Sequence, residues 1–210
     1  MTNFPRLAFL VTLCFTASGA LASSLTVQVT DAAGKPLADV VVVADAEPGV
    51  AMPRILTPGE IEQRGLKFMP LVSVVQTGSR MSFPNYDKVK HHIYSFSPAK
   101  KFDQKLYSGV AAAPQVFDKA GLVVLGCNIH DRMVSYIKVV DSPYSAKTGA
   151  DGVARIEMPA SGKYTVSAWH YNLAGTVAGQ IVALKGDGAA ALTFKLALKP
   201  AATGADAPGN

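Results

Sequence analysis

Three side chains able to bind a metal follow a short apolar run in residues 117–133, FDKAGLVVLGCNIHDRM. The apolar run 122–125 is bounded by glycine on both sides, which predicts a buried strand. Cys127 stands where that strand would run out into a loop, and His130 and Met133 follow within six residues. The chain must therefore fold so that the end of a strand presents a thiol, an imidazole and a thioether together.

A thiolate, an imidazole and a thioether form a soft ligand set that favours copper. A trigonal site of one Cys and two His with a weak axial Met is the blue-copper arrangement. The set of Cys127, His130 and Met133 lacks the second His. One short loop covers only one side of a metal, so the missing His is expected on another strand. His91 and His92 open the alternating sequence HHIYSFS, which predicts a strand, and either could be the ligand.

At these residues the chain resembles the cupredoxins, with the Cys-x2-His-x2-Met spacing of amicyanin and the upstream His of plastocyanin-like proteins. In these proteins the upstream ligand precedes a small polar residue and then an apolar one, which HHI from His91 fits better than HIY from His92. The resemblance implies one type 1 copper with four ligands, His91, Cys127, His130 and Met133. It also implies that His92 orients the loop that carries Cys127.

Residues 66–142 further resemble bacterial secreted proteins labelled methylamine utilization or plastocyanin-like. The resemblance implies a cupredoxin-like Greek-key sandwich that carries electrons to a periplasmic redox protein, such as a cytochrome c or a dehydrogenase. The alternatives are copper binding and delivery without redox chemistry, and a secreted β-sandwich that binds a partner. An enzyme is not expected, because one mature Cys excludes a dinuclear copper centre and the remaining His do not form a second cluster.

The cupredoxin resemblance also implies where electrons would enter and leave. The exposed edge of the loop His, His130, would be the contact, with Ile129 and Pro84 lining an apolar patch around it. Three basic residues would surround that patch, Lys88, Lys90 and Arg132.

The N-terminus predicts export. Residues 1–22 have one Arg, an apolar run and Ala-Leu-Ala before Ser23, which is typical of a secretory signal peptide and indicates a periplasmic protein. The apolar run is too short for a bilayer, so no membrane span is expected in the mature protein. Cys14 would leave with the signal peptide, and Cys127 would remain alone. A lone thiol in an oxidising compartment favours a metal ligand over a structural Cys.

The formal net charge of the chain is +5 and only 17% of its residues are charged. No basic cluster with interleaved aromatic residues occurs in the sequence, so nucleic acid is not expected as a partner.

A second sandwich is predicted from the two ends of the chain. Residues 25–46 contain an alternating strand, a turn and a Val-rich strand, which predicts a hairpin, and residues 147–172 contain two strands separated by glycine turns. Together they resemble the carboxypeptidase regulatory-like, or transthyretin-like, sandwich. We therefore expect an all-β chain in which a cupredoxin domain, 51–142, is inserted into a sandwich formed by 23–50 and 143–198.

Several local features complete this expectation. Residues 59–63 are predicted to form a helical turn, residues 66–83 a strand paired with the His91 strand, and residues 134–141 the last strand of the copper domain. Phe96 is interpreted as a core residue, and His170 as a satisfied polar residue at a strand end. The tail, 199–210, has no apolar periodicity and is expected to be disordered.

Overall fold

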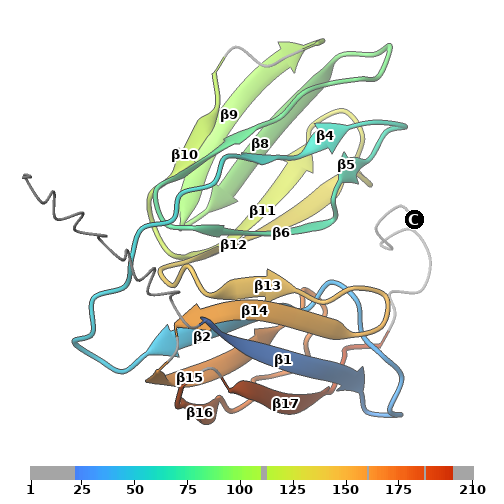
Figure 1. Ribbon diagram of the computed structural model, residues 1–210. Coiled ribbons are helices and arrows are strands. Elements are labelled where there is room, and N and C mark those ends of the chain that lie inside the picture. The colour runs from blue at the N-terminus through green and yellow to red at the C-terminus, as the bar shows by residue number, and fades with distance from the viewer. Residues whose placement is uncertain (1–21, 110–112, 160, 187, 201–210) are drawn as a thin grey trace, which may run out of the picture.

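The computed structural model describes residues 22–109, 113–159, 161–186 and 188–200. All the regular secondary structure assigned in these ranges is β-strand, which confirms the all-β prediction. The strands form two sandwiches, one above the other in Figure 1. No helix of the described residues is long and apolar enough to cross a membrane. The predicted signal peptide, apart from Ala22, lies outside the described residues.

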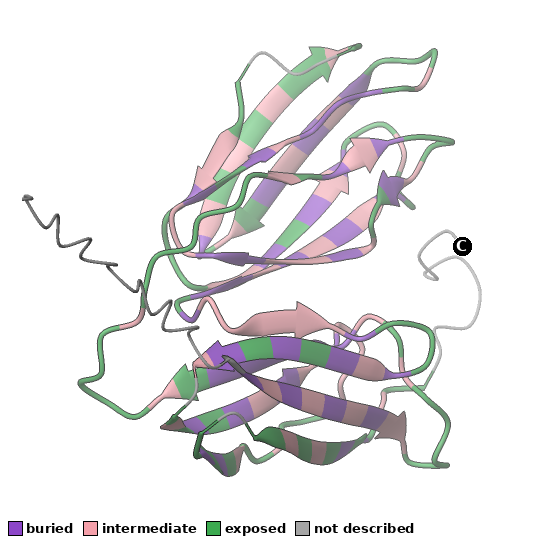
Figure 2. Ribbon diagram, viewed as in Figure 1, coloured by how far each residue is buried: buried purple, intermediate pink, exposed green. Residues whose placement is uncertain are grey.

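The first sandwich contains strands from both ends of the chain. One sheet has the order β14-β1-β17 and the other β13-β2-β15-β16. The strands are β1 (Ala22–Asp31), β2 (Val41–Ala46), β13 (Ser145–Lys147), β14 (Val153–Pro159), β15 (Gly162–Trp169), β16 (Gln180–Leu184) and β17 (Ala189–Leu196). Leu25, Val27 and Val29 alternate with polar residues along β1 and are fully buried in the core of this sandwich, as the banding of β1 in Figure 2 shows.

The predicted hairpin of residues 25–46 is wrong, because β1 and β2 lie in different sheets. β1 pairs with β14 and β17, and β2 pairs with β13 and β15. Val42 of β2 packs into the core of the first sandwich, whereas Val41 and Val43 pack toward the second. The apolar run of β2 is continuous because both faces of the strand are buried. Its two edges are hydrogen-bonded to β13 and β15.

The second sandwich lies between β2 and β13 in the sequence. Its five-stranded sheet has the order β6-β12-β11-β8-β9, its three-stranded sheet the order β10-β7-β3, and β4 pairs with β5. The strands are β3 (Gly59–Glu60), β4 (Glu62–Gln63), β5 (Phe68–Met69), β6 (Val72–Gln76), β7 (Ser79–Ser82), β8 (His91–Ser97), β9 (Lys100–Tyr107), β10 (Gln115–Phe117), β11 (Gly121–Cys127) and β12 (Val134–Val140). Inward residues of the two larger sheets share one hydrophobic cluster.

Two local predictions in this sandwich are wrong and one is confirmed. Residues 59–63 form β3 and β4 in place of a helical turn, because β3 pairs with β7 and Ile61 is fully buried. Residues 66–83 do not pair with β8, since β9 and β11 occupy both of its edges. The strand predicted at 134–141 is present as β12.

The two sandwiches meet at a third hydrophobic cluster that includes Val41 and Val43 from one side and Val72 and Val140 from the other. The side-chain amide of Gln76 donates to the carbonyls of Pro53 at 2.8 Å and Asp141 at 2.9 Å, so it joins the chain entering the second sandwich to the chain leaving it. The insertion of a domain, 51–142, between 23–50 and 143–198 stays a prediction. The two sandwiches have separate hydrophobic cores, as that prediction requires.

The end of the described chain is attached to the first sandwich. The backbone N–H of Lys199 donates to the carbonyl of Asn172 at 2.9 Å. Order therefore extends beyond residue 198, where the disordered tail was predicted to begin. Residues 201–210 of that predicted tail lie outside the described residues.

Candidate metal centre

The register of two antiparallel strands positions the upstream His. Cys127, the last residue of β11, is the partner of Ile93 in β8. Successive side chains of a strand point to opposite faces, so His91 and Ile93 share the inner face and His92 lies on the outer one. His91, Ile93 and Cys127 are all buried. A backbone hydrogen bond from Asn128 to the carbonyl of His92, 3.0 Å long, continues the pairing into the loop.

The structure brings the Cys and two of the predicted His together. The Sγ atom of Cys127 lies 3.7 Å from Nδ1 of His91 and 3.8 Å from Nδ1 of His130. One donor atom from each residue lies within 4.8 Å of the others. Metal bonds of about 2.3 Å to sulfur and about 2.0 to 2.1 Å to nitrogen place those two atoms roughly 3.5 to 3.8 Å apart, at angles between tetrahedral and trigonal. The three residues therefore fit one small metal ion.

Cys127 faces a ring nitrogen of both His91 and His130 at nearly equal distances. A thiol donates one hydrogen and its sulfur is only a weak acceptor, so hydrogen bonds alone would hold the three groups weakly. A single metal ion between the three residues could instead bind the sulfur and both nitrogens at once.

Met133 lies on the loop that follows Cys127. Its backbone N–H donates to the carbonyl of His130 at 2.9 Å, which closes the turn of the loop. Its side chain is 2% exposed and belongs to the same hydrophobic cluster as Cys127. The place of Met133 is compatible with an axial ligand, and that role stays a prediction.

His92 does not orient the Cys127 loop through its side chain. Its imidazole pairs with the carboxylate of Asp103 on β9, away from the three donor atoms. The contact with the loop comes from its backbone carbonyl instead. The expectation for the His92 side chain is therefore wrong, because the strand alternation directs that side chain outward.

Asp87 is the functional residue that the sequence analysis missed. Its Oδ2 atom lies 2.8 Å from Nε2 of the fully buried His91. Burial raises the pKa of the Asp87 carboxyl, but hydrogen bonds from His91 and from the amides of Leu66 and Gly65 outweigh it, so the pKa is lower than that of a free Asp. A signal was available, because a ligand His commonly bonds a carboxylate and Asp87 precedes His91 by four residues.

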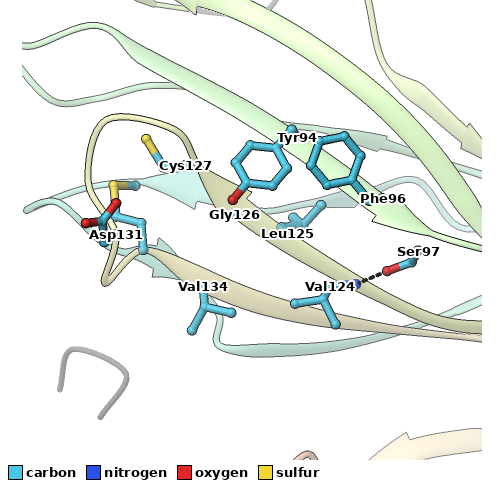
Figure 3. A pocket seen from close by; sticks show the side chains of 10 residues that line it. Tyr94, Phe96, Ser97, Val124, Leu125, Gly126, Cys127, Asp131 and Val134 are labelled. Atoms are coloured by element: carbon cyan, nitrogen blue, oxygen red, sulfur yellow. Dashed lines mark hydrogen bonds between the residues drawn. The ribbon is translucent and has the colours of Figure 1, made fainter. Parts of the chain in front are cut away.

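A pocket of about 600 Å³ lies beside the centre, and its lining residues include Cys127 and Met133. Figure 3 shows Cys127, Tyr94 and Phe96 among the side chains of this lining. The rings of Tyr94 and Phe96 lie 5.0 Å apart. Phe96 is 76% exposed, so its interpretation as a core residue is wrong. A Cβ at Gly126 would lie 2.8 Å from the Tyr94 ring, which explains the glycine before Cys127.

The residues predicted to form the docking patch differ in exposure, and their docking role stays a prediction. His130 is partly exposed and Ile129 is 47% exposed. Pro84 is buried and cannot line an exposed patch, and its carbonyl accepts a hydrogen bond from the backbone N–H of Gln63. The three basic residues predicted around the patch are all exposed, Lys88, Lys90 and Arg132.

His170 lies in the first sandwich, just after β15, and is not part of the cluster of metal-binding residues. It is 6% exposed, and its Nδ1 atom accepts the backbone N–H of Asn172 at 3.1 Å. The interpretation of His170 as a satisfied polar residue is confirmed.

Comparison with known proteins finds cupredoxins among the similar structures. No protein-family model and no curated protein matches the chain. A purple cupredoxin from Nitrosopumilus maritimus is 20% identical with a TM-score of 0.35, over 39% of this chain and 98% of its own. A reduced mutant of amicyanin is 16% identical with a TM-score of 0.35, over 48% and 98%. A copper-containing nitrite reductase from Thermus scotoductus is 21% identical with a TM-score of 0.37, over 46% and 25%.

At these identities and TM-scores, the function has to be inferred from the side chains of the site. The observation that carries most weight is the convergence of His91, Cys127 and His130.

Proposed function

We propose that this chain is a periplasmic electron carrier that binds one copper ion. His91, Cys127 and His130 would hold the ion, with Met133 as a fourth and weaker ligand. The proposal is supported chiefly by one observation, the two distances of 3.7 and 3.8 Å from the Cys127 sulfur to the His91 and His130 nitrogens. One thiolate and two imidazoles with a thioether nearby form the ligand set of a one-electron copper site.

Each protein group has a distinct part in this function. Bound copper supplies a one-electron couple. His91 and Cys127 come from neighbouring strands, so the sheet holds their donor atoms in place before the metal enters. His130 comes from the loop and is partly exposed, so it connects the buried centre to the surface. With all four ligands in place no open position is left for a substrate, which favours a carrier over an enzyme.

The proposed partner is a periplasmic redox protein, such as a cytochrome c or a dehydrogenase. Ile129 exposes an apolar side chain next to His130 in the sequence, and Arg132 exposes a positive charge on the same loop. Small, short-lived redox contacts use this combination of an apolar centre and a charged rim. The periplasmic location follows from the predicted signal peptide.

An absorption spectrum of the mature chain loaded with Cu(II) tests the proposal. An intense blue or green band is expected, because a thiolate bound to Cu(II) gives strong charge-transfer absorption. Cys127→Ser should abolish that band. A colourless wild-type protein that still binds copper would reject the carrier and favour copper delivery. A coloured Ser variant would show that Cys127 is not the sulfur ligand.

A further inference from the structure

Asp87 contacts one of the two ring nitrogens of the proposed ligand His91. A neutral imidazole carries one N–H and one lone pair. The Asp87 Oδ2 atom lies 2.8 Å from Nε2, while Nδ1 of the same ring faces the Cys127 sulfur at 3.7 Å. An ionised carboxylate only accepts hydrogen bonds, so it favours the hydrogen on Nε2. The lone pair then lies on Nδ1, on the side of the metal ligands.

Backbone groups hold the Asp87 carboxylate in place, and a neighbouring side chain holds the Asp87 backbone. The backbone N–H groups of Gly65 and Leu66 donate to its two oxygens at 2.6 and 3.0 Å. The backbone N–H of Asp87 donates to Oδ1 of the buried Asn85 at 2.9 Å. Asp87 therefore joins the turn between β4 and β5, the loop before β8 and the ring of His91.

The turn between β4 and β5 adopts a costly conformation around this carboxylate. Gly65 and Leu66 have φ angles of +63° and +59°. Leucine rarely adopts such a value, because its Cβ crowds the backbone there. The conformation directs two successive N–H groups at one carboxylate, as in an anion-binding nest. The geometry of the turn thus supports a negative charge at Asp87 beside the ligand His.

We infer that Asp87 is a positioning residue of the metal centre, which fixes the tautomer of His91 and strengthens Nδ1 as a donor. The part concerning copper rests on the proposed function. A carboxylate on the opposite nitrogen makes the imidazole more basic, and a more basic donor favours Cu(II) over Cu(I). Asp87 therefore lowers the reduction potential of the bound copper.

The same strand provides a matched control. His92, next to His91, pairs with Asp103, but its ring lies outside the metal cluster and the Asp103 side chain is half exposed. Both pairs join a His of β8 to an Asp, and only one of these His residues faces Cys127. Asp103→Asn therefore removes a similar charge without touching a ligand.

Nitrogen-15 NMR of the wild-type chain tests the tautomer without any variant. In the metal-free protein at pH 8 and in the copper(I)-loaded protein, we expect the hydrogen of His91 on Nε2 and none on Nδ1. A hydrogen on Nδ1 in the metal-free protein would overturn the proposal. This measurement does not depend on colour, so it remains decisive for the tautomer even if the proposed electron-carrier function fails.

Redox titration of the copper-loaded variants tests the effect on the metal. Loss of a carboxylate partner of this kind typically costs 10- to 100-fold in metal affinity. A preferential tenfold loss of Cu(II) affinity raises a one-electron potential by about 59 mV. We therefore expect an upward shift of this size or more for Asp87→Asn and an unchanged potential for Asp103→Asn. Equal shifts in both variants, or no shift in Asp87→Asn, would overturn the proposal. If Asp87→Asn fails to fold, the tautomer measurement decides.

Discussion

Met133 is the proposed ligand whose contribution differs most from that of the other three. An axial thioether tunes the potential of such a site, while the bond to the Cys thiolate gives the colour. Met133→Leu keeps the volume and apolar character of the side chain, at a cost below about 1.5 kcal/mol. We expect it to retain the charge-transfer band and to raise the potential, since a donor is lost.

The matched control for this change is Met81→Leu. Met81 is buried in the same hydrophobic cluster as Met133 but lies on β7, in the opposite sheet. Spectroelectrochemical titration should show an unchanged potential for the Met81 variant. Equal shifts in the two variants would mean that packing, and not an axial bond, sets the potential.

Truncation of the adjacent residues His91 and His92 should have different effects on the charge-transfer band. His91→Ala removes a buried donor atom 3.7 Å from Sγ of Cys127 and should abolish the charge-transfer band. His92→Ala removes only a partly exposed pair with Asp103 and should leave the band in place. Copper titration followed by absorption compares the two. A lost band in the His92 variant and a retained band in the His91 variant would exchange their roles.

The sequence predicted the donor residues but not all of their surroundings. Alternation along HHIYSFS requires that only one of His91 and His92 points inward, yet it does not say which. The register decides this, because Cys127 pairs with Ile93 and thereby places His91 inside. Asp87 lies in a loop without periodicity, so only its position four residues before His91 indicated that its carboxylate turns back onto that ring.

At the scale of strands, β1 and β11 offer a direct comparison of the two cores. Leu25 on β1 and Leu125 on β11 are both fully buried, each in the core of a different sandwich. Truncation of a buried Leu to Ala costs about 2 to 5 kcal/mol. Both Leu25→Ala and Leu125→Ala should lower the free energy of unfolding by this amount in denaturant titrations.

The two variants should differ in their effect on the copper site. Leu125 shares the hydrophobic cluster of Cys127 and Met133, whereas Leu25 belongs to the other sandwich. We expect Leu125→Ala to shift the charge-transfer band and Leu25→Ala to leave it unchanged. An identical spectral change in both would contradict the separation of the two cores.

Strand prediction succeeded where burial follows an alternating or apolar pattern, as in β1, β11 and β12. Pairing was predicted less well, because periodicity reports which face is buried and not which strand lies alongside. The sequence order suggested that β1 pairs with β2, whereas β1 lies between β14 and β17 from the other end of the chain. The helical turn predicted at 59–63 was wrong for a related reason, since the pairing of β3 with β7 depends on tertiary contacts.

At the scale of the whole molecule, a buried His in the first sandwich should make stability depend on pH. Burial lowers the pKa of His170 below its ordinary value, against an opposing effect of Asp39. Protonation would also break the hydrogen bond that Nδ1 accepts from Asn172. Below about pH 6.5 the unfolded chain binds a proton that the folded chain resists, so stability falls as pH decreases.

Denaturant unfolding of the metal-free protein at pH 7.5 and pH 5 measures this effect. We expect a lower free energy of unfolding at pH 5, and a smaller difference between the two pH values in His170→Gln. Comparison of the wild-type chain with the variant isolates the effect of His170, because the other three His are present in both. A difference of the same size in the variant would assign the pH dependence to those other residues.

The position of charge on the molecule, and not its net value, should govern electron exchange with an anionic partner. Arg132 is exposed on the loop that carries His130 and Met133, whereas Arg155 is exposed on β14 of the first sandwich. Arg132→Glu and Arg155→Glu change the net charge by the same amount, so they differ only in where the charge is placed. Attraction between a local positive charge and an anion raises the encounter rate by on the order of 10-fold or more at low salt.

Stopped-flow oxidation of the copper(I)-loaded protein by ferricyanide, at a series of ionic strengths, separates the two positions. Arg132→Glu should slow the reaction at low salt, and Arg155→Glu should have a smaller effect. The rates should converge as salt rises, because the screening length falls to about 8 Å at 0.15 M. Equal slowing by both variants would mean that only the net charge matters, and a larger effect of Arg155→Glu would move the site of electron exchange toward the first sandwich.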